Sequence, residues 1–185
     1  ELSLELELKV LADVGLVGFP NAGKSTLISR ISRARPKVAD YPFTTLTPQL
    51  GVVSVDVDRS FVVADLPGLI EGAAEGHGLG HQFLRHIERT RLFVFLITQD
   101  LDPDRNPTQD FRALRSELER YRSDLLDRPF ICVLSQCDRP EVLAQAEEIK
   151  SELNLDELHL ISSVTGMGIQ PLIYAISEQL FTPDD

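Results

Sequence analysis

Near the start of the chain the sequence reads Gly18-Phe19-Pro20-Asn21-Ala22-Gly23-Lys24-Ser25, which fits the pattern G-x-x-x-x-G-K-S. An apolar run ends at Val17, and a stretch with helical periodicity begins at Lys24. In this context of strand, glycine-rich loop and helix, the pattern is specific for phosphate binding. Backbone N–H groups of such a loop turn inward around an anion, and the helix N-terminus adds partial positive charge. We therefore predict a phosphate-binding loop, the alternative being a glycine-rich turn that binds nothing.

Two side chains of this loop suit a nucleotide bound with magnesium. Lys24 would reach the β- and γ-phosphate oxygens, and the Ser25 hydroxyl would ligate Mg²⁺. A second segment, Asp65-Leu66-Pro67-Gly68, follows another apolar run and fits D-x-x-G. Its carboxylate can hold a water molecule on Mg²⁺, and the Gly68 N–H can meet the γ-phosphate. Both segments follow predicted strands, and ligands of open α/β sheets bind at the carboxyl ends of strands.

Between these segments lies a loop bounded by prolines, Tyr41-Pro42-Phe43-Thr44-Thr45-Leu46-Thr47-Pro48. A threonine in this loop can give its hydroxyl to Mg²⁺ and its N–H to the γ-phosphate. Loss of that phosphate would release the loop, which is an order-to-disorder switch. The alternative is a threonine-rich entry into a strand.

Asp138, just after the apolar run 130–134, is the candidate for recognising the base. Guanine has donors at N1 and at its 2-amino group, so one carboxylate can accept from both, whereas adenine lacks this pair. Ser162-Ser163-Val164, after the last apolar run, could offer backbone N–H groups to the guanine O6 atom. These residues favour GTP over ATP; the alternative for Asp138 is a turn-forming role in its loop.

Short apolar runs alternate with stretches of helical periodicity along the chain. The predicted strands are 8–17, 51–57, 61–65, 92–97, 130–134 and 158–161, and the predicted helices are 24–33, 82–90, 111–126, 141–153 and 169–180. The short link Asp58-Arg59 predicts one antiparallel hairpin. The rest is βα alternation, so we predict a mostly parallel, doubly wound six-stranded α/β sheet with helices on both faces.

The first residues of the chain differ from the rest. Residues 1–9 alternate leucine with charge, as one face of a strand does. The chain opens at Glu1 without an initiator methionine, so we interpret 1–9 as the tail of a preceding domain in a longer protein. Residues 10–185 are then predicted to form one domain.

Composition argues against several classes of protein. The 185 residues are 43% hydrophobic and 25% charged, which is typical of globular proteins. No apolar run approaches the roughly 20 residues of a membrane helix. The formal net charge of −11 argues against a direct grip on a nucleic-acid backbone, because that grip comes from lysine and arginine. Cys132 and Cys137 lack the spacing of a metal site or a disulfide framework, so we predict a cytoplasmic domain.

Segments 15–26, 40–51 and 65–90 resemble the G domain of the Obg family of P-loop GTPases, and the resemblance covers essentially the whole chain. It is most specific in DLPGLIEGAAEGHGLGHQFLRHIERT at 65–90 and in YPFTTLTP at 41–48. The resemblance implies a Ras-like G domain that acts as a slow GTP-hydrolysing switch in large ribosomal subunit assembly and in the stress response. It also implies GTP and GDP as ligands, Mg²⁺ as cofactor and large-subunit particles as partners.

Motif matching to this family implies a full set of site residues. Lys24, Thr45 and Gly68 would act in catalysis, and Ser25 and Thr45 would ligate Mg²⁺. The nucleotide-binding residues would be Gly18, Phe19, Pro20, Asn21, Ala22, Gly23, Lys24, Ser25, Thr26, Phe43, Thr44, Thr45, Asp65, Leu66, Pro67, Gly68, Ser135, Gln136, Asp138, Ser162, Ser163 and Val164.

One motif departs from the family. The base-reading sequence is usually Asn-Lys-x-Asp, and here it is Ser135-Gln136-Cys137-Asp138. Serine can still form the hydrogen bond of the asparagine, with a shorter reach. Glutamine can pack flat against the base, as the lysine stem does, but brings no charge. We expect the guanine preference to persist with weaker affinity; relaxed guanine specificity is the alternative.

Hydrolysis is expected to be slow. In Ras-like proteins a glutamine just after D-x-x-G orients the attacking water, and here that position is Leu69, which cannot hydrogen-bond. Asn21 resembles the asparagine that ligates K⁺ in potassium-stimulated GTPases, so K⁺ at this residue is one hypothesis and turn geometry is the other. His77 and His81, in the glycine-rich stretch 68–80, are either catalytic or surface residues. A nucleotide-dependent binding module with little hydrolysis is the rival to an active GTPase.

Overall fold

The computed structural model describes residues 12–38, 48–66, 87–88, 90–100, 102 and 104–182, with the backbone alone for residues 37 and 38. The strands are β1 (Val14–Val17), β2 (Lys37–Val38), β3 (Gln49–Ser54), β4 (Ser60–Asp65), β5 (Leu92–Ile97), β6 (Phe130–Leu134) and β7 (His159–Leu160). The helices are α1 (Lys24–Ile31), α3 (Pro107–Tyr121), the 3₁₀ helix η1 (Ser123–Asp127), α4 (Pro140–Leu143), α5 (Ala146–Glu152) and α6 (Ile169–Phe181).

These strands form one sheet in the order β2-β3-β4-β1-β5-β6-β7. β1 lies at its centre, parallel to β4 and β5, and the pairs β5–β6 and β6–β7 are also parallel. β3 is antiparallel to β4 and to β2. The mostly parallel, doubly wound sheet and its hairpin are therefore confirmed. The predicted six strands are corrected to seven over the described residues, because the two-residue edge strand β2 is too short to form an apolar run.

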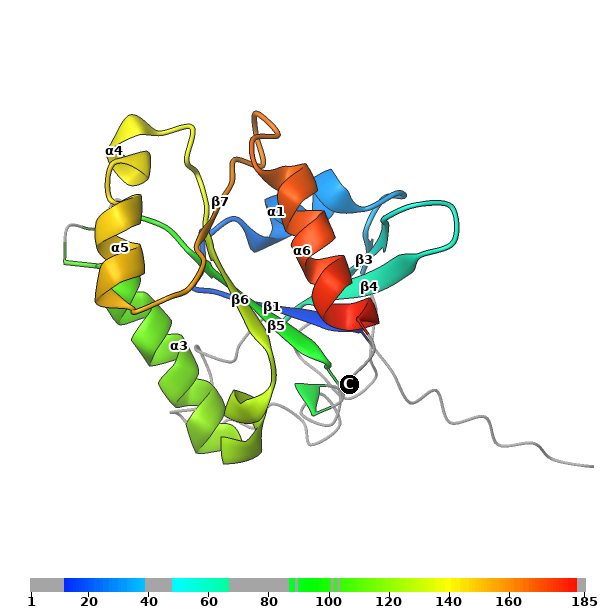
Figure 1. Cartoon of the computed structure of the whole chain (residues 1–185), viewed down its shortest axis with the longest axis horizontal. Helices are drawn as coiled ribbons and strands as arrows, with labels where there is room; N and C mark the ends of the chain where they lie inside the picture. Colours follow the sequence, from blue (N-terminus) through cyan, green and yellow to red (C-terminus); the bar gives the residue numbers. More distant parts are fainter. Residues whose placement is uncertain are drawn as a thin grey trace, which may run out of the picture.

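Apolar side chains fill the spaces between the sheet and the helices on its two faces. β5 is buried at all six positions, because a central parallel strand is covered on both faces. On one face Phe95 packs against Phe111 of α3, with ring centroids 5.2 Å apart. On the other face Val94 joins a cluster with Ile28 of α1 and Leu172 of α6. Figure 1 shows α1 and α6 together on one side, with α3 and α5 on the opposite side.

Helix boundaries differ from the predicted ranges where local caps decide them. α3 begins at Pro107, before the predicted start at 111, because the Asn106 side chain accepts a hydrogen bond from the Thr108 N–H at 2.8 Å. The predicted helix 141–153 consists of α4 and α5, which are separated at Ala144 and Gln145. Over the part of the chain that the structure describes, no helix is long and apolar enough to span a membrane.

Two predicted elements lie outside the described residues. One is the strand-like stretch 1–9, and the other is most of the helix predicted at 82–90. The interpretation of 1–9 as the tail of a preceding domain, with the G domain at 10–185, therefore stays a prediction.

The glycine that precedes α6 allows a prediction about stability. Gly168 has a φ angle of 70°, and a Cβ atom built on it would lie 1.9 Å from the carbonyl oxygen of Leu160. Alanine would combine left-handed backbone strain with a clash against another backbone segment. We expect Gly168→Ala to lower the free energy of unfolding by about 3 kcal/mol. Urea denaturation measures this change.

Gly166 provides a matched control in the same loop. Its φ angle is 90°, and a Cβ atom there would meet only the guanidinium end of the Arg30 side chain, 2.6 Å from Nη2. Because that side chain can move, Gly166→Ala should cost only about 1 kcal/mol. Equal losses in the two variants would contradict the importance of the Leu160 contact.

Candidate functional site

The predicted phosphate-binding loop connects β1 to α1 at the carboxyl end of the central strand. Asn21 and Gly23 have positive φ angles of 65° and 98°, which turn the chain back before the helix. The Lys24 side chain crosses the loop, and its Nζ donates to the carbonyl oxygens of Gly18 at 2.8 Å and Phe19 at 3.1 Å. The ammonium group is therefore held within the loop, where its charge can meet an anion.

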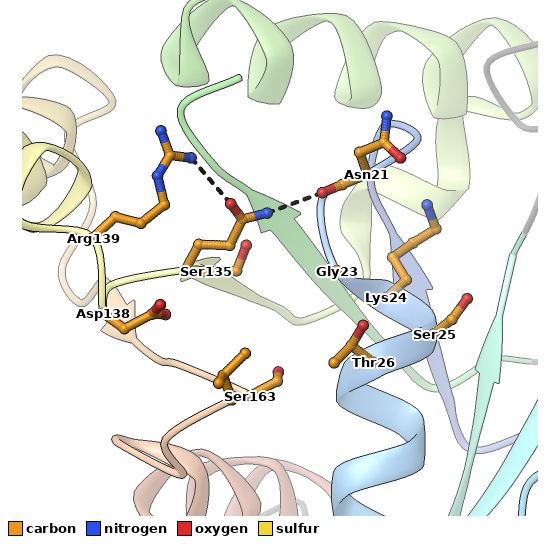
Figure 2. Close-up of a pocket in the computed structure, with 11 residues that line it drawn as sticks. Asn21, Gly23, Lys24, Ser25, Thr26, Ser135, Asp138, Arg139 and Ser163 are labelled. Carbon is orange, nitrogen blue, oxygen red and sulfur yellow. Dashed lines mark hydrogen bonds between the residues drawn. The ribbon is translucent and has the colours of Figure 1, made fainter. Parts of the chain in front are cut away.

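A pocket of about 480 Å³ opens beside this loop (Figure 2). Three loops, which follow β1, β6 and β7, line it together with the start of α1: Asn21, Gly23, Lys24, Ser25, Thr26, Ser135, Gln136, Asp138, Arg139, Ser163 and Val164. Figure 2 shows Asp138 and Ser163 on one side and the start of α1 on the other. The fold thus brings the predicted phosphate-binding and base-reading residues to one cavity.

Two hydrogen bonds tie the loop after β6, which carries the predicted base-reading residues, to the loop after β1. Ser135 Oγ donates to the carbonyl oxygen of Ala22 at 2.6 Å, and Gln136 Nε2 donates to that of Asn21 at 3.0 Å. Ser135 is buried, and its own carbonyl oxygen accepts a hydrogen bond from Thr98 Oγ1 at 3.2 Å. The serine therefore keeps the two loops connected, because a backbone carbonyl lies within reach of its short side chain.

Asp65 ends β4, in register with Leu16 of the adjacent strand β1. Its carboxyl group is buried, and Oδ1 has no hydrogen-bond partner among the described residues. Burial raises the pKa of Asp65, against the lowering effects of the Lys24 charge and a hydrogen bond from Ser25. A buried carboxylate oxygen without a partner, close to a hydroxyl, is a donor set that suits Mg²⁺. Asp65 and Ser25 therefore fit a magnesium site.

Several predicted site residues do not line the pocket. Leu66 is buried in the core, and the Phe19 ring lies 4.3 Å from the guanidinium carbon of Arg105. Ser162 is fully buried, and its N–H donates to the Met167 carbonyl oxygen at 2.9 Å, so it shapes the loop that presents Ser163 and Val164. Gly18, Pro20 and Ala22 complete the phosphate-binding loop.

The remaining predicted residues lie outside the part of the chain that the structure describes: Phe43, Thr44, Thr45, Pro67 and Gly68, with Leu69, His77 and His81. The second hydroxyl ligand of Mg²⁺ and the γ-phosphate contact are assigned to these segments. Both assignments therefore stay predictions.

Arg139 lines the pocket although no motif in the sequence points to it. It follows Asp138 directly, and its Nη1 donates to the Gln99 carbonyl oxygen at 3.0 Å and to Gln136 Oε1 at 3.1 Å. Its Nε donates to Glu141 Oε1 at 2.9 Å. Two features of the sequence could identify it. Gln136 is uncharged at the position where the family carries lysine, and a cation, Arg139, follows three positions later.

Cys132 and Cys137 are both buried, free thiols. Burial raises the pKa of Cys132 to about 12 and also raises the pKa of Cys137. Because the thiolate is the reactive form, neither thiol suits nucleophilic chemistry at neutral pH.

Known proteins with similar sequences are GTPases, which agrees with a pocket suited to a nucleotide. A family model described as "50S ribosome-binding GTPase" matches residues 13–136. GTPase Obg from Solibacter usitatus is 54% identical over 185 residues, covering 99% of this chain and 55% of that protein. GTPase Obg from Bacillus pumilus is 53% identical over 183 residues, covering 98% and 43%. The chain thus spans about half the length of the curated relatives it matches.

Solved structures show the same fold. The G domain of the T. maritima FeoB iron transporter has a TM-score of 0.64 at 23% identity, covering 90% of this chain and 96% of that one. A variant of Era from Aquifex aeolicus, bound to GDP and AlF₄⁻, has a TM-score of 0.67 at 24% identity, covering 96% and 58%. These likenesses confirm the predicted Ras-like P-loop fold. The chain belongs to the 50S ribosome-binding GTPase family, and its G domain is of the Obg type.

Proposed function

We propose that this domain binds GTP and GDP together with Mg²⁺ and hydrolyses GTP slowly, as a molecular switch. The observation that carries the proposal is the pocket in which Lys24 and Ser25 face Asp138 and Ser163. The phosphates would bind on the side of Lys24 and Ser25, because the loop N–H groups, the Lys24 charge and the helix N-terminus all favour an anion. The base would bind on the side of Asp138 and Ser163, because the Asp138 carboxylate can accept hydrogen bonds from both donors of guanine.

The side chains would bind, orient and balance charge while water attacks the γ-phosphate in line, releasing GDP and phosphate. Lys24 would contact the β- and γ-phosphate oxygens. Ser25 directly and Asp65 through water would hold Mg²⁺, with Thr45 as the assigned second hydroxyl ligand. Mg²⁺, when bound, would supply positive charge that offsets the negative charge developing on the transferred phosphoryl group. The Gly68 N–H is assigned the γ-phosphate contact.

Titration calorimetry with GDP, a non-hydrolysable GTP analogue and ADP tests the choice of ligand. We expect both guanine nucleotides to bind more tightly than ADP, and the GTP analogue to bind more tightly with Mg²⁺ than without it. Equal affinities for GDP and ADP would exclude the guanine assignment to Asp138. They would support the relaxed specificity that the altered Ser135-Gln136 pair leaves open.

Slow hydrolysis follows from Leu69, which cannot orient an attacking water as the glutamine of Ras-like proteins does. The second candidate, favoured by the same residue, is a nucleotide-dependent binding module with little hydrolysis. Single-turnover assays with and without large ribosomal subunit particles distinguish them. Phosphate release that the particles accelerate identifies an enzyme, whereas tight GTP binding without release identifies a module.

We further propose that K⁺ binds near Asn21 and offsets charge that develops during hydrolysis. The position of Asn21 in the predicted phosphate-binding loop supports this proposal, because it resembles that of the asparagine that ligates K⁺ in potassium-stimulated GTPases. The φ angle of 65° at Asn21 supports the alternative of turn geometry, because asparagine tolerates a left-handed backbone. Hydrolysis rates in KCl and in NaCl decide between them, since equal rates would exclude K⁺.

We infer that the partner is the large ribosomal subunit, in assembly and in the stress response, and that the protein acts in the cytoplasm. The family description and the likeness to GTPase Obg support this inference. Because the formal net charge is −11, we do not expect this domain alone to bind the phosphate backbone of ribosomal RNA electrostatically. Co-sedimentation with ribosomal particles should depend on whether GDP or a GTP analogue is bound.

A further inference from the structure

Gln136 occupies the position of the lysine in the base-reading motif of the family, and it lines the pocket. Both ends of its carboxamide are engaged. Nε2 donates to the Asn21 carbonyl oxygen at 3.0 Å, and Oε1 accepts from Arg139 Nη1 at 3.1 Å. These two hydrogen bonds are the dashed lines in Figure 2. Both hydrogen bonds are made within the protein, and they fix the plane of the carboxamide at the wall of the pocket.

The backbone supports the same arrangement. Gln136 has a φ angle of 61°, in the left-handed region that a residue with a side chain rarely adopts. The Arg139 N–H donates to the Gln136 carbonyl oxygen at 3.0 Å and closes a turn around Cys137 and Asp138. Such a conformation persists only where its surroundings impose it, and such positions cluster at ligand sites.

Arg139 is itself held by three acceptors, two of them near it in the sequence and one in the loop after β5. Besides Gln136, these are the Gln99 carbonyl oxygen at 3.0 Å and Glu141 Oε1 at 2.9 Å. Its side chain is 27% exposed, so most of its surface is packed. Arginine stays charged at all relevant pH values and binds through a rigid planar fork. One continuous chain of hydrogen bonds thus joins the loops after β5, β6 and β1.

We propose that Arg139 is a positioning residue for the nucleotide base and, with Gln136, replaces the missing lysine. Arg139 holds the Gln136 carboxamide in the plane on which a base can lie. Its guanidinium also brings to this wall the positive charge that glutamine lacks. The proposal rests on the proposed guanine-nucleotide site and names a residue that acts there. The competing explanation is that Arg139 only stabilises its own loop through Glu141.

The test is a double-mutant cycle with the dissociation constant for GDP, measured by calorimetry, as the readout. We expect Arg139→Ala to weaken GDP binding by about tenfold, and Arg139→Lys by less, since lysine keeps the charge but loses the fork. Gln136→Lys restores the residue of the family. In that background, Arg139→Ala should change the dissociation constant by less than about twofold.

Two results would overturn the proposal. One is unchanged GDP binding in Arg139→Ala, even if urea denaturation shows a less stable apo protein, because that pattern marks a purely structural role. The other is an equal loss from Arg139→Ala in both backgrounds, because Arg139 would then act independently of Gln136.

Arg120→Ala is the matched control. Arg120 also pairs with an acidic neighbour, Glu117 at 3.0 Å, but does so on the surface of α3 and not at the pocket. We expect its GDP affinity to equal that of the parent chain. A parent chain that fails to bind GDP would refute the proposed function itself, whereas GDP binding that is insensitive to Arg139 would refute the positioning role alone.

Discussion

The Lys24→Ala variant is expected to bind GTP about 1,000-fold more weakly than the parent chain, which corresponds to about 4 kcal/mol. The reason is that Lys24 reaches the pocket from within the loop, where its Nζ is held by the carbonyl oxygens of Gly18 and Phe19. A cation fixed in this way can make charge-assisted hydrogen bonds to two phosphate groups at little cost in side-chain entropy. Calorimetric titration with a GTP analogue in Mg²⁺ measures the loss.

Lys150→Ala is the control for the change in net charge. Lys150 lies in the last turn of α5 and does not line the pocket. Removing its charge should leave GTP affinity unchanged within error. A loss for Lys24→Ala that is no larger than the loss for Lys150→Ala would mean that the phosphates do not bind at this loop.

Asp65→Asn is expected to separate stability from magnesium binding. The wild-type carboxylate is buried and one of its oxygens has no partner among the described residues, so the apo protein carries the cost of desolvating a charge. The asparagine has nearly the same shape without the charge. We therefore expect the apo variant to melt at a higher temperature. We also expect Mg²⁺ to lose its effect on GTP affinity, a loss of about 100-fold relative to the parent chain with Mg²⁺.

The stability gain of Asp65→Asn should depend on pH with a definite sign. Burial raises the folded-state pKa of Asp65 above the ordinary aspartate value of 3.8. Well below pH 3.8 the Asp65 carboxyl group is protonated in both the folded and the unfolded chain, and it makes no pH-dependent contribution to the free energy of unfolding. As the pH rises through the window up to the raised pKa, the unfolded chain loses the proton first, so the folded state is destabilised. The advantage of asparagine should therefore grow with pH and become constant above the folded-state pKa. Urea denaturation of both proteins from about pH 4 to pH 7 measures it.

Asp56→Asn is the control for Asp65→Asn, because it removes the charge of an aspartate that is exposed and not buried. Asp56 is exposed in the β3–β4 hairpin, and a hydrogen bond from the Arg59 side chain is the largest of the effects that lower its pKa. Replacing it removes a favourable contact and no burial cost, so no stability gain and no change in the Mg²⁺ effect are expected. A similar gain in both variants would show that general charge, and not burial at the site, explains the effect of Asp65→Asn.

Much of the fold could be predicted because its signals are local. The buried strand β5 reads as six consecutive apolar residues, and its predicted and observed bounds agree. The edge strand β2 could not be predicted, because a pair of residues needs only backbone hydrogen bonds to β3. The start of α3 depends on the cap at Asn106 and not on the apolar periodicity that defined the prediction.

The conformation of the predicted phosphate-binding loop was determined by the sequence itself, because its contacts are short in range. The glycine with a φ angle of 98° and the lysine that bonds back to Gly18 lie within one run of eight residues. The same holds for the carboxylate of Asp65, whose place at a strand end follows from the apolar run before it. The family resemblance also rests on continuous runs of sequence, most specifically 65–90 and 41–48.

Tertiary structure alone decided how the distant loops meet. That the short Ser135 side chain still reaches Ala22, 113 positions away, depends on how closely the loops after β1 and β6 approach. Whether Asp65 Oδ1 has a hydrogen-bond partner among the described residues, and whether Arg139 contacts Gln136, depends on which atoms come within about 3 Å of each other. Sequence patterns record residue type and spacing along the chain. A hydrogen bond between loops is decided by distance and direction in space, which only the packed sheet and its helices provide.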